Sequence, residues 1–146
     1  MRAVVQRVGS ARVEVEGEVV GAIGRGLLVY LGVGKGDGAA QRAWMLDKIL
    51  GLRIFPNEEG KMHASVLDVG GELLVVSQFT LYGNVRKGRR PSFEGAMAPR
   101  EAEAEIEAFV ADAARRIRVA TGKFGADMKV TSMNDGPVTI WIESPE

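Results

Sequence analysis

The sequence predicts an α/β fold in which a mixed, largely antiparallel sheet curls into a barrel-like core covered by about two helices. Three observations lead to this prediction: Val-rich segments with alternating apolar positions, two segments with helical spacing, and a length of 146 residues. Strands and helices with one apolar face bury that face against each other. A chain of this length fits one compact domain, so we expect residues 1–146 to form a single domain.

The first third of the chain predicts two pairs of strands. Residues 3–8 and 11–16 place Val at alternating positions around Gly9-Ser10, a pattern that predicts a hairpin with a tight turn. Residues 18–24 and 26–33 predict a second pair, because the glycines between them interrupt the pattern. The second member of this pair is nearly all apolar, which is typical of a strand buried on both faces.

The middle of the chain predicts one helix and one strong strand. In residues 38–51 the apolar side chains recur with helical spacing, and the glycine at position 51 predicts the end of the helix. Residues 52–55 predict a short strand before a turn. Residues 72–80 predict a strand that begins with aliphatic residues and then becomes polar. Residues 82–98 have no regular pattern, and irregular segments of this length tend to be functional.

The last third predicts a second helix and two closing strands. Residues 99–120 begin with a proline, place acidic side chains early and arginines late, and therefore suit the geometry and dipole of a helix. Residues 127–133 and 137–143 predict strands that flank Asn134-Asp135-Gly136-Pro137. This composition predicts a turn between them.

Composition narrows the classes of function. The 19 basic and 19 acidic residues cancel, so contact with RNA would require a local basic patch. The chain has no cysteine and a single histidine, His63, which excludes thiolate chemistry and leaves the histidine without a catalytic partner. We interpret His63 as a surface or packing residue, and we expect no metal and no cofactor. The first seven residues lack the apolar segment of a signal peptide, so we expect a cytoplasmic protein with no membrane association.

A glycine-rich run, Gly32-Val33-Gly34-Lys35-Gly36-Asp37-Gly38, invites comparison with nucleotide-binding loops. A phosphate-binding loop needs Gly five residues before its Gly-Lys pair and Ser or Thr after it, but Val29 and Gly36 occupy these positions. The dinucleotide fingerprint also fails, since Asp37 stands where its last Gly belongs. We interpret the run as a tight turn between a strand and a helix.

Three polar segments are candidates for a site, and the first ends the strand of residues 72–80. Ser77, Gln78, Phe79 and Thr80 follow four aliphatic residues, which is unusual for a plain core strand. One interpretation is a strand edge whose side chains form local hydrogen bonds. The other is a pocket floor whose backbone N–H groups face developing negative charge.

The second and third segments also have two interpretations each. Arg86-Lys87-Gly88-Arg89-Arg90, with Phe93 close behind, is either a solvated charge run or a patch that binds RNA phosphates beside a stacking surface. Asn134-Asp135-Gly136-Pro137-Val138-Thr139 is either a hairpin turn or, with a cis Gly-Pro bond, a rigid wall of carbonyl oxygens.

Together these segments resemble the signatures of the D-aminoacyl-tRNA deacylase family, in the family's order. The matching residues are 77–81, 87–93 and 134–139, and residues 1–8 are similar to the family's first strand. The resemblance covers essentially the whole chain. It implies an editing hydrolase that cleaves the ester of D-aminoacyl-tRNA to free tRNA and D-amino acid, and thereby proofreads the charging of tRNA.

The resemblance also implies how the reaction proceeds. The 2′-hydroxyl of the terminal ribose is implied to assist hydrolysis. Because the sequence offers no acid–base set, our own hypothesis is that the backbone N–H groups of Phe79 and Thr80 hold the carbonyl or its oxyanion. Ser77 and Gln78 orient them. Attack by the Thr80 hydroxyl is an alternative, although nothing in the sequence activates that group. Contacts with the tRNA acceptor end fall on the basic loop, that is Arg86, Lys87, Arg89, Arg90 and Phe93.

Selection of the D-amino acid is implied to work by exclusion. Gly136 and Pro137 form a wall that clashes with an L side chain, and the family's pattern places this wall in the pocket of a second copy, so a homodimer is expected. Glycine has no side chain to clash, which predicts slow cleavage of glycyl-tRNA. Arg7 matches a family position that anchors the wall. Asn134, Val138 and Thr139 support it.

Two other classes of function are compatible with the residues alone. A non-enzymatic RNA-binding module would use the basic loop with Phe79 or Phe93, but the chain is neutral and lacks an RNA-binding signature. A small-molecule esterase would use Thr80 or Ser77, but the sequence lacks a Gly-x-Ser-x-Gly elbow and a triad. Deacylation of D-tyrosyl-tRNA compared with L-tyrosyl-tRNA distinguishes the three.

Overall fold

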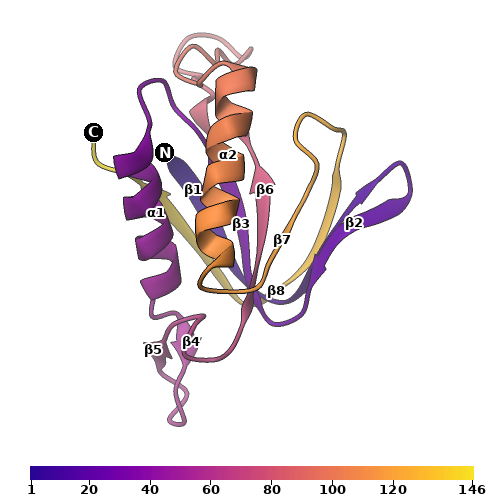
Figure 1. Ribbon diagram of the computed structural model, residues 1–146, viewed down its shortest axis with the longest axis vertical. Helices are drawn as coiled ribbons and strands as arrows, with labels where there is room; N and C mark the ends of the chain where they lie inside the picture. Colours follow the sequence, from indigo (N-terminus) through magenta and orange to yellow (C-terminus); the bar gives the residue numbers. More distant parts are fainter.

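The sheet and its two helices are seen in a computed structural model that describes residues 1–146 (Figure 1). The two helices stand side by side on one face of the sheet, and the two chain ends lie close together beside α1. In chain order the elements are β1 (Arg2–Val15), β2 (Glu18–Ile23), β3 (Gly26–Gly32), α1 (Ala39–Gly51), β4 (Phe55–Pro56), β5 (Met62–Ala64), β6 (Glu72–Ser77), η1 (Phe79–Tyr82), α2 (Pro99–Ala114), β7 (Val119–Thr121) and β8 (Lys129–Glu143).

The strand β1 runs without a break through Gly9-Ser10, so the predicted hairpin at this position is wrong. One edge of β1 pairs with β8 along nearly its whole length, and this long antiparallel partner keeps the chain extended. The pairing shifts register on either side of Val8, so Gly9-Ser10 marks an irregularity in the strand rather than a turn. The turn comes later, at Glu16 and Gly17, whose φ angles are 52° and 81°.

The predicted pairing of residues 18–24 with residues 26–33 is also wrong. β2 and β3 both pair with the same edge of β1, β2 with its second half and β3 with its first half. The chain therefore continues in the same direction along β1 through Gly24–Gly26 and does not reverse there. Both strands bury apolar side chains against the body of the sheet in this arrangement, which a separate hairpin would not achieve.

The sheet continues from β3 to β6 and β7 through parallel pairing. At its far end β7 approaches β2, where Gly21 lies directly against the Thr121 backbone and has no room for a side chain. Because β2 and β7 are the two ends of the strand order, this contact nearly closes the sheet. The mixed α/β fold with a barrel-like sheet and two helices is as the sequence predicts.

Two apolar clusters occupy the two faces of the sheet. The larger lies between the sheet and the helices and includes Phe55, Met45 of α1 and Phe109 of α2, all fully buried. The smaller lies on the opposite face and includes Leu28 and Leu74, so β3 is buried on both faces as predicted. Neither helix combines the length and the apolar character that crossing a membrane requires.

Three predicted boundaries are wrong at the ends of elements. α2 ends at Ala114 rather than near residue 120, because Val119–Thr121 pairs with β6 as β7. β6 ends at Ser77 rather than at residue 80, because a 3-10 turn follows. The two predicted closing strands are one strand, β8, with an irregularity where the turn was expected.

Candidate active site

The first candidate segment turns sharply where β6 leaves the sheet. Ser77 pairs with Leu31, and the N–H of Gln78 donates to the carbonyl of Leu31 over 2.8 Å. The 3-10 turn η1 follows at once, and its first hydrogen bond runs from the N–H of Leu81 to the carbonyl of Gln78. In such a turn the N–H groups of the first two residues have no partner inside the turn. Those two residues are Phe79 and Thr80.

Both residues lie at the surface beside a pocket. Phe79 is 56% exposed, and its ring meets that of Phe93 edge to face with 5.1 Å between centroids. The amide of Gln78 donates to the hydroxyl of Thr80 over 2.5 Å, so a local hydrogen bond holds that hydroxyl. No acid or histidine contacts the Thr80 hydroxyl.

The pocket has a volume of about 580 Å³ and lies between η1, the segment leading into α2, and the stretch before β8. Its floor includes Ser77, Gln78 and Phe79, which the sequence predicted. Fourteen of its 18 lining residues are hydrophobic, and none carries a titratable side chain. Such a pocket suits an apolar or aromatic group and contains no general acid or base of its own.

The basic loop projects from the segment next to this pocket. Asn84 and Ser92 pair across its base through two backbone hydrogen bonds of 2.7 and 2.9 Å, so residues 85–91 form a closed tip. All four cations of the tip are exposed and take part in no ion pair: Arg86, Lys87, Arg89 and Arg90. Phe93 follows the base of the loop and lines the pocket. Exposed positive charge therefore adjoins the pocket.

The third candidate segment is a bend within β8, and its Gly136-Pro137 peptide bond is cis. Both residues are exposed. Arg7 of β1 lies beneath them: its Nε donates to the carbonyl of Asp135 over 3.0 Å, and its Nη1 donates to the carbonyl of Ile54 over 2.7 Å. The guanidinium thereby connects the bend to β1 and to the chain before β4.

The side chain of Asn134 closes this bend from the other side. Its Oδ1 accepts the N–H of Val138 over 3.2 Å, and its Nδ2 donates to the hydroxyl of Thr139 over 3.1 Å. The amide of Gln6 donates to the same hydroxyl. Val138 is buried in the larger core, which fixes the outgoing side of the bend. Arg7, Asn134, Val138 and Thr139 are therefore brought together around Gly136-Pro137.

The bend and the pocket lie apart within one chain. Ser77 is level with Ala3 of β1 across the sheet, whereas the bend is level with Arg7. Four strand residues separate these levels, or about 13 Å along the strand. Neither Gly136 nor Pro137 lines the pocket.

Comparisons with known proteins place this combination of segments in a family. A family model described as D-Tyr-tRNA(Tyr) deacylase matches residues 4–143. Proteins named D-aminoacyl-tRNA deacylase are 58% identical in Heliobacterium modesticaldum, over 98% of this chain and 96% of the relative, and 56% identical in Thermotoga petrophila, over 99% and 97%. This chain belongs to the D-aminoacyl-tRNA deacylase family.

Solved structures agree with this deacylase fold. One described as c-Myc DNA Unwinding Element Binding Protein has a TM-score of 0.95 and 47% identity, and each chain is covered completely. Another, described as a probable eukaryotic D-amino acid tRNA deacylase, has a TM-score of 0.81 and 21% identity over 97% of each chain, and it shows likeness of fold alone.

Sequence reasoning missed most of the walls of this pocket. Met97, Ile106, Phe124, Met128 and Val130 line it, and in the sequence they look like ordinary core residues. The one available signal was their position, since several fall in or near the irregular segments at the two ends of α2. Apolar residues give no sign of whether they face a core or a cavity.

Of the two features set aside in the sequence, His63 lies outside this pocket, and the glycine-rich run contributes only Val33 to its lining. His63 on β5 is exposed, and its nearest polar partner is Arg53, with 2.5 Å between Nη2 and Nδ1. The glycine-rich run connects β3 to α1, as predicted. No group of three or more acidic or histidine side chains is arranged to hold a metal ion.

Proposed function

We propose that this chain hydrolyses the ester bond of D-aminoacyl-tRNA in the cytoplasm, releasing free tRNA and the D-amino acid. The observation that carries the proposal is an apolar pocket whose floor is the exposed start of η1 and whose rim adjoins four exposed cations. An aminoacylated RNA end has the matching parts, namely a base or side chain to bury, an ester to polarise and phosphates to neutralise. Family membership supports the same activity.

The pocket lining contains no titratable group, so the chemistry needs a proton carrier from elsewhere. We propose that the 2′-hydroxyl of the terminal ribose fills this role, because it is next to the ester in the substrate itself. Water adds to the carbonyl carbon, the bond to the ribose 3′-oxygen breaks, and that oxygen takes the proton. The N–H groups of Phe79 and Thr80 hold the developing oxyanion. Ser77 and Gln78 fix the start of the turn.

The basic loop completes the substrate site. Arg86, Lys87, Arg89 and Arg90 are unpaired in this chain and stand ready to replace the counterions of RNA phosphates. Phe93, in contact with Phe79, offers an aromatic surface for the terminal adenosine.

Chirality is selected, in this proposal, by the Gly136-Pro137 wall of a second copy of the chain. Within one chain the wall is too far from Phe79 to act, and both of its residues are exposed. A homodimer that inserts the wall beside η1 would place carbonyl oxygens where an L side chain has to point. A D side chain points away, and glycine has none, so slow cleavage of glycyl-tRNA is expected.

The decisive experiment compares D-tyrosyl-tRNA ending in adenosine with the same substrate ending in 2′-deoxyadenosine. Loss of the 2′-hydroxyl is expected to lower kcat by about 10²-fold or more, the usual contribution of a positioned acid or base, with KM little changed. L-tyrosyl-tRNA serves as the control that separates deacylation from RNA binding. Equal turnover of the two D substrates would overturn the RNA-assisted step, and equal turnover of D- and L-tyrosyl-tRNA would overturn the wall.

A further inference from the structure

The glycine-rich run after β3 has a role that its sequence pattern did not reveal. A Cβ atom on Gly34 would lie 2.6–2.8 Å from the Oη, Cζ and Cε1 atoms of Tyr82, and one on Gly32 would lie 3.3 Å from the Cδ2 atom. A Cβ atom on Gly95 would lie 3.4 Å from the Cδ1 atom of the same ring. None of these glycines has a positive φ angle. At Gly34 the space for the Tyr82 ring is therefore what favours glycine, whereas at Gly32 a Cβ atom would first meet the carbonyl oxygen of Gln78 at 2.9 Å, and at Gly95 the ring is in ordinary contact.

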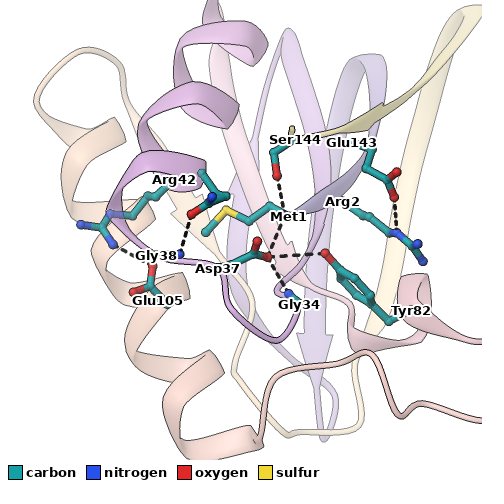
Figure 2. Close-up of polar contacts among 11 residues, drawn as sticks. Met1, Arg2, Gly34, Asp37, Gly38, Arg42, Tyr82, Glu105, Glu143 and Ser144 are labelled. Atoms are coloured by element: carbon teal, nitrogen blue, oxygen red, sulfur yellow. Dashed lines mark hydrogen bonds and ion pairs between the residues drawn. The ribbon is translucent and has the colours of Figure 1, made fainter. Parts of the chain in front are cut away.

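Polar groups surround the same ring (Figure 2). The guanidinium carbon of Arg2 stands 4.4 Å from the ring centroid, and the Nη1 of Arg2 donates to the carbonyl of Leu81 over 3.0 Å. Asp37 lies 3.5 Å from the Tyr82 hydroxyl, and its carboxylate is fixed by the N–H of Gly34 and the α-amino group of Met1, each at 2.7 Å. At 3.5 Å the hydroxyl contact is weak, so ring packing and Arg2 contribute more.

These contacts anchor the C-terminal end of η1, whose start is held to β3 by the hydrogen bond from the Gln78 N–H to the Leu31 carbonyl. None of its four residues is buried. Its first residue, Phe79, touches Phe93, which belongs to the exposed segment after the basic loop. The last residue, Tyr82, enters the glycine cradle, and the carbonyl before it is held by Arg2. Partial burial raises the pKa of Tyr82, and the Asp37 carboxylate raises it further, so the phenol stays neutral.

We propose that Tyr82 is a positioning residue for deacylation. Its ring, seated against Gly32, Gly34 and Gly95 and held by Arg2, fixes the orientation of the Phe79–Thr80 backbone. This inference rests on the function proposed above. A group displaced by about 1 Å from its productive position can lose 10²-fold in rate, so the anchor of an otherwise superficial turn controls kcat.

The test removes the ring and compares the loss with that at the chain's other tyrosine. Tyr82→Ala is expected to lower kcat for D-tyrosyl-tRNA by about 10–100-fold with KM nearly unchanged, while Tyr82→Phe keeps kcat within about threefold of wild type. Tyr30 on β3, which packs against the smaller core, provides the matched control. Tyr30→Ala also lowers the melting temperature but leaves kcat at 25 °C near that of wild type. A wild-type kcat in folded Tyr82→Ala, or equal kcat losses in the two alanine variants, overturns the proposal.

Gly34→Ala tests the cradle itself. The added methyl collides with the ring, so the single variant is expected to lose kcat as Tyr82→Ala does. In the Tyr82→Ala background the methyl has room, so the double variant loses no more than Tyr82→Ala alone, and fully additive losses contradict the mechanism. If Tyr82→Ala does not fold, Arg2→Gln replaces it: a severalfold lower kcat at constant KM is expected, and an unchanged kcat overturns the proposal. Wild-type protein without D-tyrosyl-tRNA turnover would instead overturn the proposed function.

Discussion

Replacing Arg7 with methionine removes the guanidinium that connects the β8 bend to β1 and to the chain before β4. The guanidinium is 13% exposed and donates to the carbonyls of Asp135 and Ile54. Methionine has a similar length and fills much of the same volume, so the substitution removes the two hydrogen bonds and a long ion pair of 3.9 Å to the exposed Asp135 carboxylate, which contributes little. Both carbonyls lose a charged donor. Water can replace it at the exposed Asp135 carbonyl, and does so less readily at the part-buried Ile54 carbonyl.

The size of the effect follows from these two bonds. A hydrogen bond to a charged group contributes about 1.5–3 kcal/mol, and partial rehydration and methionine packing recover some of the total, which leaves a loss of about 2–4 kcal/mol. For a chain of this length 1 kcal/mol corresponds to about 3–4 °C, so the melting temperature is expected to fall by roughly 6–16 °C. Arg7→Lys keeps the charge but cannot donate to both carbonyls as the guanidinium does. Its melting temperature is therefore expected to lie between those of the wild type and Arg7→Met.

Thermal unfolding followed by circular dichroism measures this change, with Arg12→Met as the control. Arg12 lies on the same strand, is about half exposed and pairs with Glu14, so its loss is expected to cost less than about 1 kcal/mol. The functional readout is the ratio of L- to D-tyrosyl-tRNA cleavage, which should rise in Arg7→Met because the wall is no longer held. A melting temperature within about 2 °C of wild type refutes the structural reasoning. A lower melting temperature with an unchanged ratio refutes the role of Arg7 in selection.

Four further outcomes are expected. Thr80→Ala retains most of its kcat, because the proposal uses the backbone N–H, whereas a Thr80 nucleophile demands near-total loss. Replacing the four loop cations by Gln raises KM and flattens its salt dependence by about 0.7 in log–log slope per cation, with no change in melting temperature. The Gly24 N–H, and after it Arg118, lower the pKa of the Glu72 carboxyl group. The ionised carboxylate therefore stabilises the fold above its ordinary pKa, and this stabilisation is lost as the pH falls through the lowered pKa. Glu72→Gln should lower the denaturant midpoint of unfolding at pH 7 and lower it much less in acid. Mixing Tyr82→Ala with Gly136→Ala, whose Cβ would meet Val138 and Arg7 at 2.9 and 3.0 Å, should restore D-selective activity in mixed dimers; no recovery would count against a wall shared between chains.

The local pattern of the sequence predicts which segments are strands more reliably than it predicts their partners. The alternation in residues 3–16 is visible as two strands, but the pattern is equally compatible with a turn or with an irregularity at Gly9-Ser10. The outcome depends on β8, which begins more than a hundred residues later and pairs along nearly all of β1. The same partner decides that residues 127–143 form one strand. Long-range pairing of this kind leaves no mark in a local window.

The candidate site divides in a similar way. Polar residues after an aliphatic run, and cations on an irregular segment, are conspicuous because they break the expected pattern, and these predictions fall around one pocket. The apolar walls of that pocket are not conspicuous, because Met97, Ile106 and Phe124 satisfy the pattern of a core. The glycine run was interpreted as a plain turn because it matches neither the phosphate-binding loop nor the dinucleotide fingerprint. Its packing against Tyr82 depends on a side chain nearly fifty residues away.

Two arginines of β1 show why the site is specified at long range. Arg2 donates to the carbonyl of Leu81 and Arg7 to that of Asp135, so one strand fixes both η1 and the β8 bend through main-chain acceptors. Main-chain acceptors are present at every residue and impose no sequence preference at the far end of the bond. The donors are ordinary arginines near the start of the chain, and the loops they hold lie 79 and 128 residues further along. If catalysis and chiral selection both rest on backbone groups, Arg2, together with the Tyr82 ring it holds, controls the first and Arg7 the second. The two can therefore be weakened independently by substitutions on the same strand.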